Sequence, residues 1–302
     1  MSTAITRPVS SHAAAADARR DAPILLALTR SPDCATATRA AADLAKALGV
    51  GVHVIHSWIP MNTAFGPAGQ PSIDLELAYE QPAAEVLRSA GAHLRSEGVV
   101  VLDEHLVMGL AADEIVAVAA GIGARLVVTG SRGLGLIKRL VLGSVSQGVV
   151  NASTAAPVLV VRNGDHAWPP ERILVGYDGS TSSRRAAESG AEIANATGAE
   201  VVIVTVVTPD VLMATLPGEA AKAAALMVRA IADELAETHG IAIRTEVLTG
   251  DTIHNLLSMA ATSSPTLVAV GSRGDGLLRR VALGSVSMAI LHAADGPVLI
   301  SH

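Results

Sequence analysis

The 302-residue sequence has a single cysteine, Cys34, and only 2% of its residues are aromatic. One cysteine cannot form an intrachain disulfide, so a reducing compartment is the simpler expectation. With so few aromatic side chains, alanine, valine, leucine and isoleucine must fill the interior. This composition favours buried parallel strands covered by alanine-rich helices.

Long apolar runs and an excess of positive charge are also missing. No run approaches the roughly 18 to 20 residues of a membrane span, and residues 1–22 lack the sustained apolar stretch of a signal peptide. We interpret this segment as a flexible leader and expect a cytoplasmic protein that does not enter a membrane. A net charge of −6 and a pI near 5.9 argue against a general attraction to nucleic acid.

Two familiar phosphate-binding motifs are absent as well. The chain has no G-x-x-x-x-G-K-[ST] sequence, and neither half carries G-x-G-x-x-G. What it does have is one glycine-rich loop written twice. GSRGLGLIKRLVLGSVS occupies residues 130–146, GSRGDGLLRRVALGSVS occupies residues 271–287, and the two match at 12 of 17 positions.

The repetition extends over both halves of the chain. Residues 23–58 and 172–207 each read as a strand, an alanine-rich helix and a second strand. Further pairs follow in the same order: third strands at 99–109 and 241–250, helices at 110–123 and 251–264, fourth strands at 124–130 and 266–272, and last strands at 156–161 and 296–301. Strands separated by helices indicate crossover connections and a mostly parallel sheet.

We therefore expect an α/β protein of two tandem doubly wound domains. Each has a five-stranded parallel sheet with helices on both faces. The predicted division is a leader at 1–22, a first domain at 23–162, a linker at 163–171, where asparagine, glycine and two prolines cluster nearby, and a second domain at 172–302.

Each glycine loop follows a strand and opens a helix, a place where free backbone N–H groups and the helix dipole favour an anion. Glycine also lets the backbone approach a ligand without a Cβ in the way. In the second half, phosphate oxygens would lie between backbone amides and the hydroxyls of Ser285 and Ser287. The plainer alternative is that the glycines serve turns and helix-sheet packing; two copies with one spacing favour phosphate binding.

The pattern G-x2-G-x9-G-[ST] resembles the nucleotide-binding motif of the universal stress protein family, whose fold is adenine-nucleotide α-hydrolase-like. Gly130, Gly133, Gly143 and Ser144 match it, as do Gly271, Gly274, Gly284 and Ser285. The order of strands is similar too, and two fused copies resemble the tandem members common in actinobacteria. The resemblance implies ATP binding, with Mg²⁺ bridging the phosphates, and dimerisation through the last strand.

Carried onto this sequence, the resemblance assigns a nucleoside contact to Asp178 and adenine recognition to the backbone near Val206. The full set of implied nucleotide-binding residues is Asp178, Gly179, Val206, Gly271, Arg273, Gly274, Gly284, Ser285, Val286 and Ser287, together with Gly130, Arg132, Gly133, Gly143, Ser144, Val145 and Ser146. The first half departs at one place, because Thr29 aligns with Asp178 and Arg30 with Gly179. We expect weaker binding there.

His53 and His56 alternate along one predicted strand and are therefore expected to share a face, which raises the question of a metal. No third ligand stands at a supporting spacing, so we expect no metal site and no protein ligand for Mg²⁺.

The leading hypothesis is an ATP-binding regulator of the stress response that forms a homodimer and acts on a downstream protein partner that the sequence does not identify. One alternative is a nucleotide-independent dimerising scaffold; another is a slow ATPase. The enzymes of the related α-hydrolase group carry H-x-G-H or S-G-G-x-D-S motifs, and this chain has neither after its first strands. We therefore assign no catalytic residue.

Overall fold

The computed structural model describes residues 21–28, 34–59, 73–131, 143–154, 156–162, 168–214, 218–262, 266–272 and 283–302, with only the backbone described at 73–79 and 214. The first half contains β1 (Ile24–Leu28), α2 (Cys34–Leu48), β2 (Val52–Trp58), α3 (Ile73–Ser96), β3 (Val101–Met108), α4 (Ala111–Gly121), β4 (Leu126–Gly130), α5 (Ser144–Ala152) and β5 (Val158–Val161). The predicted order of strands and helices is confirmed.

The second half repeats this order with one additional short helix. It contains β6 (Arg172–Gly176), α6 (Thr181–Thr197), β7 (Glu200–Val207), α7 (Pro209–Ala214), α8 (Glu219–His239), β8 (Ile243–Thr249), α9 (Thr252–Ala261), β9 (Thr266–Gly271), α10 (Ser285–Ala293) and β10 (Val298–Ser301). None of the helices in the described part of the chain combines the length and the apolar character needed to cross a membrane.

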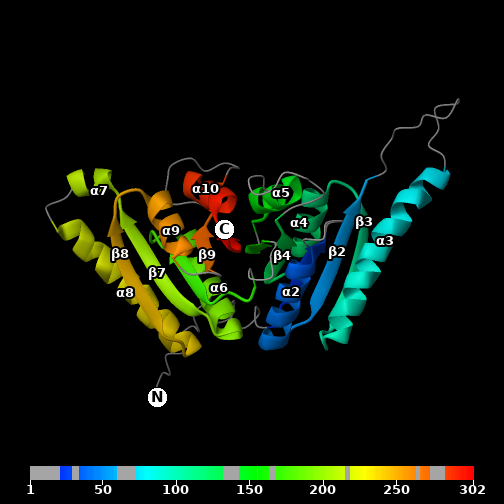
Figure 1. Ribbon diagram of the computed structural model, residues 1–302, viewed down its shortest axis with the longest axis horizontal. Helices are drawn as coiled ribbons and strands as arrows, with labels where there is room; N and C mark the ends of the chain where they lie inside the picture. The colour runs from blue at the N-terminus through cyan, green and yellow to red at the C-terminus, as the bar shows by residue number, and fades with distance from the viewer. Residues whose placement is uncertain are drawn as a thin grey trace, which may run out of the picture.

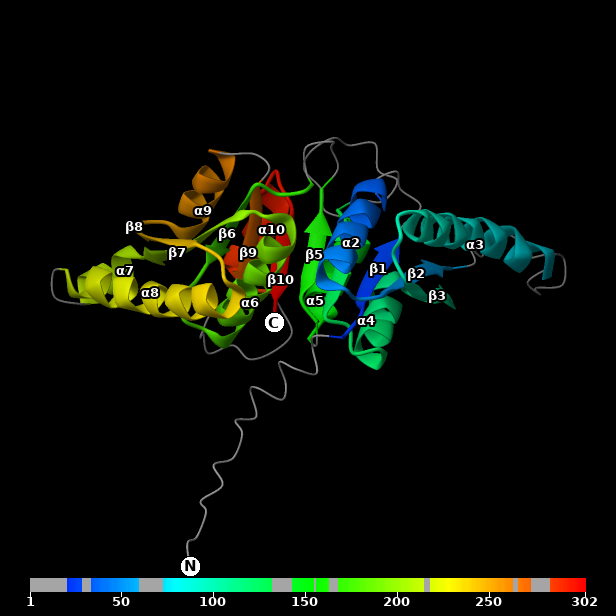
Figure 2. The same cartoon turned by 90° about the horizontal axis from the view of Figure 1, so that it is seen from below.

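All ten strands belong to one sheet, in the order β3-β2-β1-β4-β5-β10-β9-β6-β7-β8. Every pairing within a half is parallel, which confirms the predicted doubly wound halves. The two halves join where β5 and β10 run antiparallel, with Leu159 opposite Leu299. Figure 1 shows the halves on either side of this junction, and Figure 2 shows β5 beside β10 at the centre.

Helices cover both faces of the sheet, and each face has its own core. Small alanines of α2 and α6, with larger residues of α3 and α8, pack on one face against residues such as Ile24 and Ile173. Helices α4, α5, α9 and α10 cover the other face, where Leu25 and Leu174 point. The strands therefore alternate between two buried layers, and this burial explains why apolar residues run through them almost without interruption.

Polar contacts reinforce the junction between the halves. The Trp168 indole N–H donates to Asp43 at 3.0 Å. Arg162, at the end of β5, donates to the Leu291 carbonyl in the last turn of α10 at 2.6 Å. A cation at a helix C-terminus also interacts favourably with the helix dipole. The halves thus form one body as well as one sheet.

The pairing of the last strands also corrects one prediction. The two halves do pair through these strands, as expected, but within the chain. Strand β5 is flanked by β4 and β10, and β10 by β5 and β9, so neither strand keeps an open edge. A homodimer of the folded chain through these strands, as predicted from the sequence, has no edge to use.

Candidate functional site

A tight turn at the end of β6 orients Asp178. Gly179 has φ +85°, a left-handed conformation that side-chain-bearing residues rarely adopt. Ser180 follows it and donates both its backbone N–H and its hydroxyl to Asp178 Oδ1, at 3.0 and 2.6 Å. The exposed carboxylate therefore has one oxygen fixed by the turn, while Oδ2 has no partner among the described residues.

The same turn starts helix α6. The Ser180 hydroxyl accepts from the Ser183 backbone N–H at 3.2 Å, an N-cap that satisfies one of the free donors of the helix. Ser183 Oγ in turn accepts from the Asp178 backbone N–H at 3.4 Å. Asp178 is thus fixed to the beginning of α6 at two points.

Gly271 brings the end of β9 against this helix start. A Cβ at Gly271 would lie 2.6 Å from the Ser183 backbone nitrogen and 2.7 Å from the Ser182 carbonyl carbon. Only glycine allows that approach, so the plainer explanation, helix-sheet packing, accounts for this glycine. The contact also places the strand that leads into the glycine loop directly beside the Asp178 turn.

Helix α10 begins without a side-chain cap, because its N-cap residue is Gly284. The Gly284 N–H donates to the Ser272 carbonyl at 2.7 Å and so is already engaged. The next three amides, of Ser285, Val286 and Ser287, belong to the first turn and have no acceptor within the helix. Helix α5 of the first half begins in the same way after Gly143, and the amides of Ser144, Val145 and Ser146 have no acceptor within that helix.

The hydroxyl of Ser287, which was predicted to bind phosphate, and that of its counterpart Ser146 both bind a backbone carbonyl. Ser287 Oγ donates to the Gly271 carbonyl at 2.5 Å, and Ser146 Oγ donates to the Gly130 carbonyl at 2.6 Å; both serines are buried. A phosphate oxygen needs a donated proton, and these two protons are committed to the strand ends. Both hydroxyls fix the helix to its strand. The predicted nucleotide-binding role of Ser146 and Ser287 stays a prediction, and it rests on their backbone amides. Ser285 and Ser144, in contrast, are exposed.

Other predicted positions lie outside the described residues. These are Arg132, Gly133, Arg273 and Gly274 in the glycine loops, and Thr29 and Arg30 after β1. The structure therefore brings together Asp178, Gly179, Gly271 and the start of α10, while the middle of each loop stays a prediction from the sequence.

Val206 lies two residues beyond Val204, the last residue of β7 that pairs with β6. The Val204 carbonyl accepts from the Tyr177 N–H at 2.8 Å, so the backbone of β7 faces β6 there. Alternate residues of a strand direct their main-chain groups to the same neighbour. The Val206 backbone accordingly faces the region past the end of β6, on the side where Asp178 follows.

The first half has a buried histidine near the corresponding strand ends, which the sequence analysis did not connect to this edge. His56 is 4% exposed, and its Nδ1 lies 3.0 Å from the Leu28 carbonyl at the end of β1. When the pair β1 and β2 is aligned with the pair β6 and β7 by strand register, His56 occupies the position of Thr205. His56 and His53 lie on opposite faces of β2, because they are three positions apart on a strand of period two. The expectation of a shared face was wrong.

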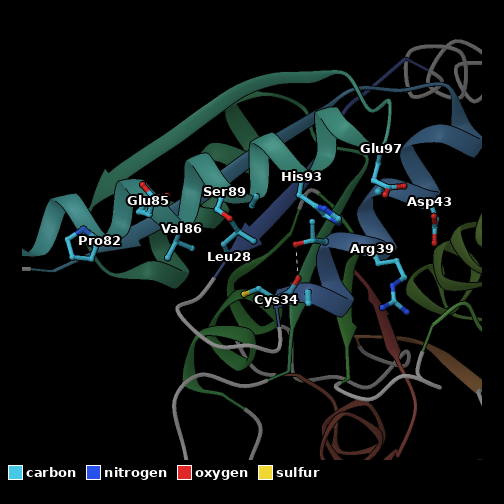
Figure 3. Close-up of a pocket in the computed structure, with 14 residues that line it drawn as sticks. Leu28, Cys34, Arg39, Asp43, Pro82, Glu85, Val86, Ser89, His93 and Glu97 are labelled. Atoms are coloured by element: carbon cyan, nitrogen blue, oxygen red, sulfur yellow. Dashed lines mark hydrogen bonds between the residues drawn. The ribbon is translucent and has the colours of Figure 1, made fainter.

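A groove of about 1200 Å³ in the described part of the first half opens between α2 and α3, and Leu28 at the end of β1 is among its lining residues. Figure 3 shows Arg39 and Asp43 of α2 and Glu85 and His93 of α3 around it.

In the second half, an ion pair between Arg184 and Glu234 connects α6 to α8. The hydrogen bond from Arg184 to Glu234 raises the pKa of the guanidinium above its usual range.

Comparisons with known proteins agree with this architecture. The family model of the Universal stress protein family matches residues 22–162 and again 170–302. A universal stress protein of Mycolicibacterium smegmatis is 36% identical over 141 residues, which are 43% of this chain and 47% of that protein. The match thus spans about half the length of that relative.

A universal stress protein of Thermus aquaticus is 37% identical over 139 residues, covering 46% of this chain and 97% of that protein. Among solved structures, a universal stress protein from Archaeoglobus fulgidus is similar over 93% of this chain and 98% of its own, with a TM-score of 0.66 and 23% identity. That similarity shows the fold.

Proposed function

The chain belongs to the universal stress protein family, and from this premise we propose that its second half binds ATP and that the bound nucleotide regulates what the protein contacts. The observation that carries the proposal is the start of α10. It offers the amides of residues 285–287 without a side-chain cap, at the same edge of the sheet as the exposed Asp178 carboxylate. Gly271 connects the two, since it contacts the start of α6 and accepts from Ser287.

The open helix start suits the phosphates. Free N–H groups and the positive end of the helix dipole favour an anion, and the exposed Ser285 hydroxyl adds a donor. Arg273 and Gly274, from the same loop, complete the phosphate site in this proposal. Mg²⁺ would be held mainly by phosphate oxygens, because Asp178 is the only carboxylate among the described residues assigned to the site and its role is the nucleoside.

The nucleoside would lie against the ends of β6 and β7. Asp178 keeps Oδ2 available for ribose or base donors, while Oδ1 is fixed by Ser180. The Val206 backbone, past the last β6 pairing, would recognise the adenine edge. This arrangement uses a charged acceptor, which makes hydrogen bonds worth roughly 1.5 to 3 kcal/mol against about 1 for neutral groups.

A direct path links each glycine loop to the junction between the halves. Ser272 donates its N–H to the Ser301 carbonyl at the end of β10, and Ser131 donates to Val161 at the end of β5, at 2.6 and 2.9 Å. These are the two strands that pair antiparallel across the junction. A phosphate that moves either loop would therefore act on the contact between the halves, which is the physical basis that we propose for regulation.

We propose that the first half binds nucleotide more weakly, because Thr29 stands in place of the aspartate. We propose a cytoplasmic location for the protein, because a chain with a single cysteine forms no intrachain disulfide and suits a reducing compartment. Any homodimer would use a surface other than the edges of β5 and β10. The alternatives remain a nucleotide-independent scaffold, favoured by the continuous ten-stranded sheet, and a slow ATPase.

One experiment separates these functions. The full chain is purified without added nucleotide, denatured, and the released small molecules are identified by mass spectrometry; calorimetry with Mg·ATP follows on the stripped protein. We expect ATP in the extract and saturable ATP binding. No nucleotide in the extract and no heat of binding at millimolar ATP would overturn the proposal in favour of the scaffold. Release of inorganic phosphate over hours would identify the slow ATPase.

A further inference from the structure

Two histidines and an aspartate of the first half come together at the edge of the sheet. His53 Nδ1 lies 2.9 Å from His105 Nε2, and the two rings stack with centroids 5.1 Å apart. Asp103 Oδ2 lies 3.8 Å from the same His105 nitrogen. One ligand atom from each residue lies within 4.8 Å of the others.

A β-bulge creates this arrangement. Val52 pairs with Val101, but the register then shifts, so that His53 lies opposite Asp103 and Ile55 opposite His105. Without the extra residue, Leu102 would lie opposite His53, and Asp103 and His105 would point to the other face of the sheet. Leu102 is instead displaced and is 52% exposed. The bulge thus places a carboxylate and an imidazole next to His53 at the cost of exposing a leucine.

We propose that His53, His105 and Asp103 form a binding site for a first-row divalent cation, with Zn²⁺ as the reference ion. Two imidazole nitrogens and one carboxylate oxygen are ligands that such ions prefer. Three protein ligands leave a position for water. Ligand atoms of a tetrahedral zinc at about 2.0 to 2.1 Å lie roughly 3.3 Å apart, so the two imidazoles need to separate by only a few tenths of an ångström.

The geometry of the two rings suits a cation, because His53 Nδ1 and His105 Nε2 face each other. Neutral imidazole is the ligand form, and binding requires each ring to carry its proton on the nitrogen that faces away from the partner. His105 is partly exposed and Asp103 more so, so the open side of the cluster can be reached from solvent.

The second half provides an internal comparison. Its strands β7 and β8 pair in plain register, with Val202 opposite Arg244 and Val204 opposite Glu246. Val202 stands where the first half has His53, and Arg244, which pairs with Glu200 at 2.8 Å, stands where it has Asp103. A valine and an arginine cannot hold a cation. The proposed site is therefore a property of the first half, and it lies near the amino end of β2, away from the strand ends proposed for the nucleotide.

Calorimetric titration with ZnCl₂ tests the proposal, using the full chain without a histidine tag after treatment with a chelator. We expect one Zn²⁺ per chain for the unmodified protein and at least a tenfold weaker affinity for His53→Val, which introduces the residue of the second half. Asp103→Asn, at an exposed position, should also weaken binding while leaving the fold intact. His254→Gln, an exposed histidine outside the cluster, is the matched control.

Absence of Zn²⁺ binding at 100 μM, or unchanged affinity in both His53→Val and Asp103→Asn, would overturn the proposal. Circular dichroism of each variant shows whether the fold is kept. Asp178→Ala should leave the zinc titration unchanged, so the result is independent of the proposed nucleotide site.

Discussion

The two halves of this chain share the same arrangement of strands and helices, and they differ at the carboxyl and amino ends of the strands. Both fold into the same five-stranded order, and in both a serine in the helix after the glycine loop donates to the carbonyl of the glycine that ends the fourth strand. At the carboxyl ends of the strands, however, the second half has Asp178 where the first has Thr29. At the amino ends, the first half has the His53 cluster where the second has Val202 and Arg244.

The difference teaches which parts of the repeat are structural. In each half a serine hydroxyl connects the helix after the glycine loop to the end of the fourth strand. Both copies keep this serine and glycine, because the same strand must contact the same helix: Ser146 with Gly130, and Ser287 with Gly271. Corresponding positions whose side chains take no part in this packing differ between the two halves. A side chain common to both halves can thus reflect shared packing, whereas a side chain found in one half points to what that half does.

The largest effect is expected at Gly271, where the end of β9 packs against the backbone at the start of α6. Gly271→Val would place a side chain against the backbone of Ser182 and Ser183, and such overpacking should lower the free energy of unfolding by about 3 kcal/mol. Urea denaturation measures this loss. Gly121→Ala, at the end of α4 with open space around its Cβ position, is the control and should lose nothing. Equal stability of the two variants would refute the packing role of Gly271.

Asp178→Ala should remove the difference between the halves in ATP binding. Losing a charged acceptor costs about 1.4 kcal/mol or more, which is tenfold in affinity. Calorimetry on the unmodified chain should show two classes of site, and the variant should lack the tighter one. Thr29→Ala should change little. If Thr29→Ala removes the tighter class instead, the assignment of the two halves is reversed.

Ser180→Ala removes the N-cap of α6 and one of the two hydrogen bonds to Asp178 Oδ1, the one donated by the hydroxyl, while the backbone N–H still donates. We expect a loss of about 1 kcal/mol in unfolding free energy, together with weaker ATP binding, because the carboxylate is held by one hydrogen bond in place of two. Ser258→Ala, at an exposed position inside α9, is the control for serine removal. Weaker stability with unchanged ATP affinity would separate the cap from the site.

The smallest effect concerns the junction itself. Arg125 of the first half pairs with Glu192 of the second at 3.1 Å, and the arginine side chain is only 9% exposed. Glu192→Gln should cost about 0.5 to 1 kcal/mol, whereas Asp233→Asn, in an exposed pair with Arg229, should cost about 0.3 kcal/mol or less. Chemical denaturation of both variants gives the comparison. A larger loss for Asp233→Asn would show that the junction pair contributes little.

Much of the fold could be predicted because its signals are local. Apolar runs, alanine-rich helices and glycine turns recur along the chain, so the strands were predicted in the right order, whereas the short helix α7 was not predicted. The turn at Asp178 was recognisable too, since Gly179 and Ser180 have the chemistry that a left-handed residue and an N-cap require. For Ser287 the sequence indicated a hydroxyl near the loop, and nothing local revealed that Gly271 would accept its proton.

The sequence by itself determined the repeat, the succession of strands along each half and the location of the glycine loops, because these follow from periodicity and turn chemistry within a few tens of residues. The tertiary structure decided how distant segments meet. Pairing of β5 with β10 uses the edges expected for a homodimer, and a bulge of one residue moves Asp103 and His105 onto the face of His53. Strand register is a relation between segments about fifty residues apart, and a shift of one residue reverses the face of every side chain that follows.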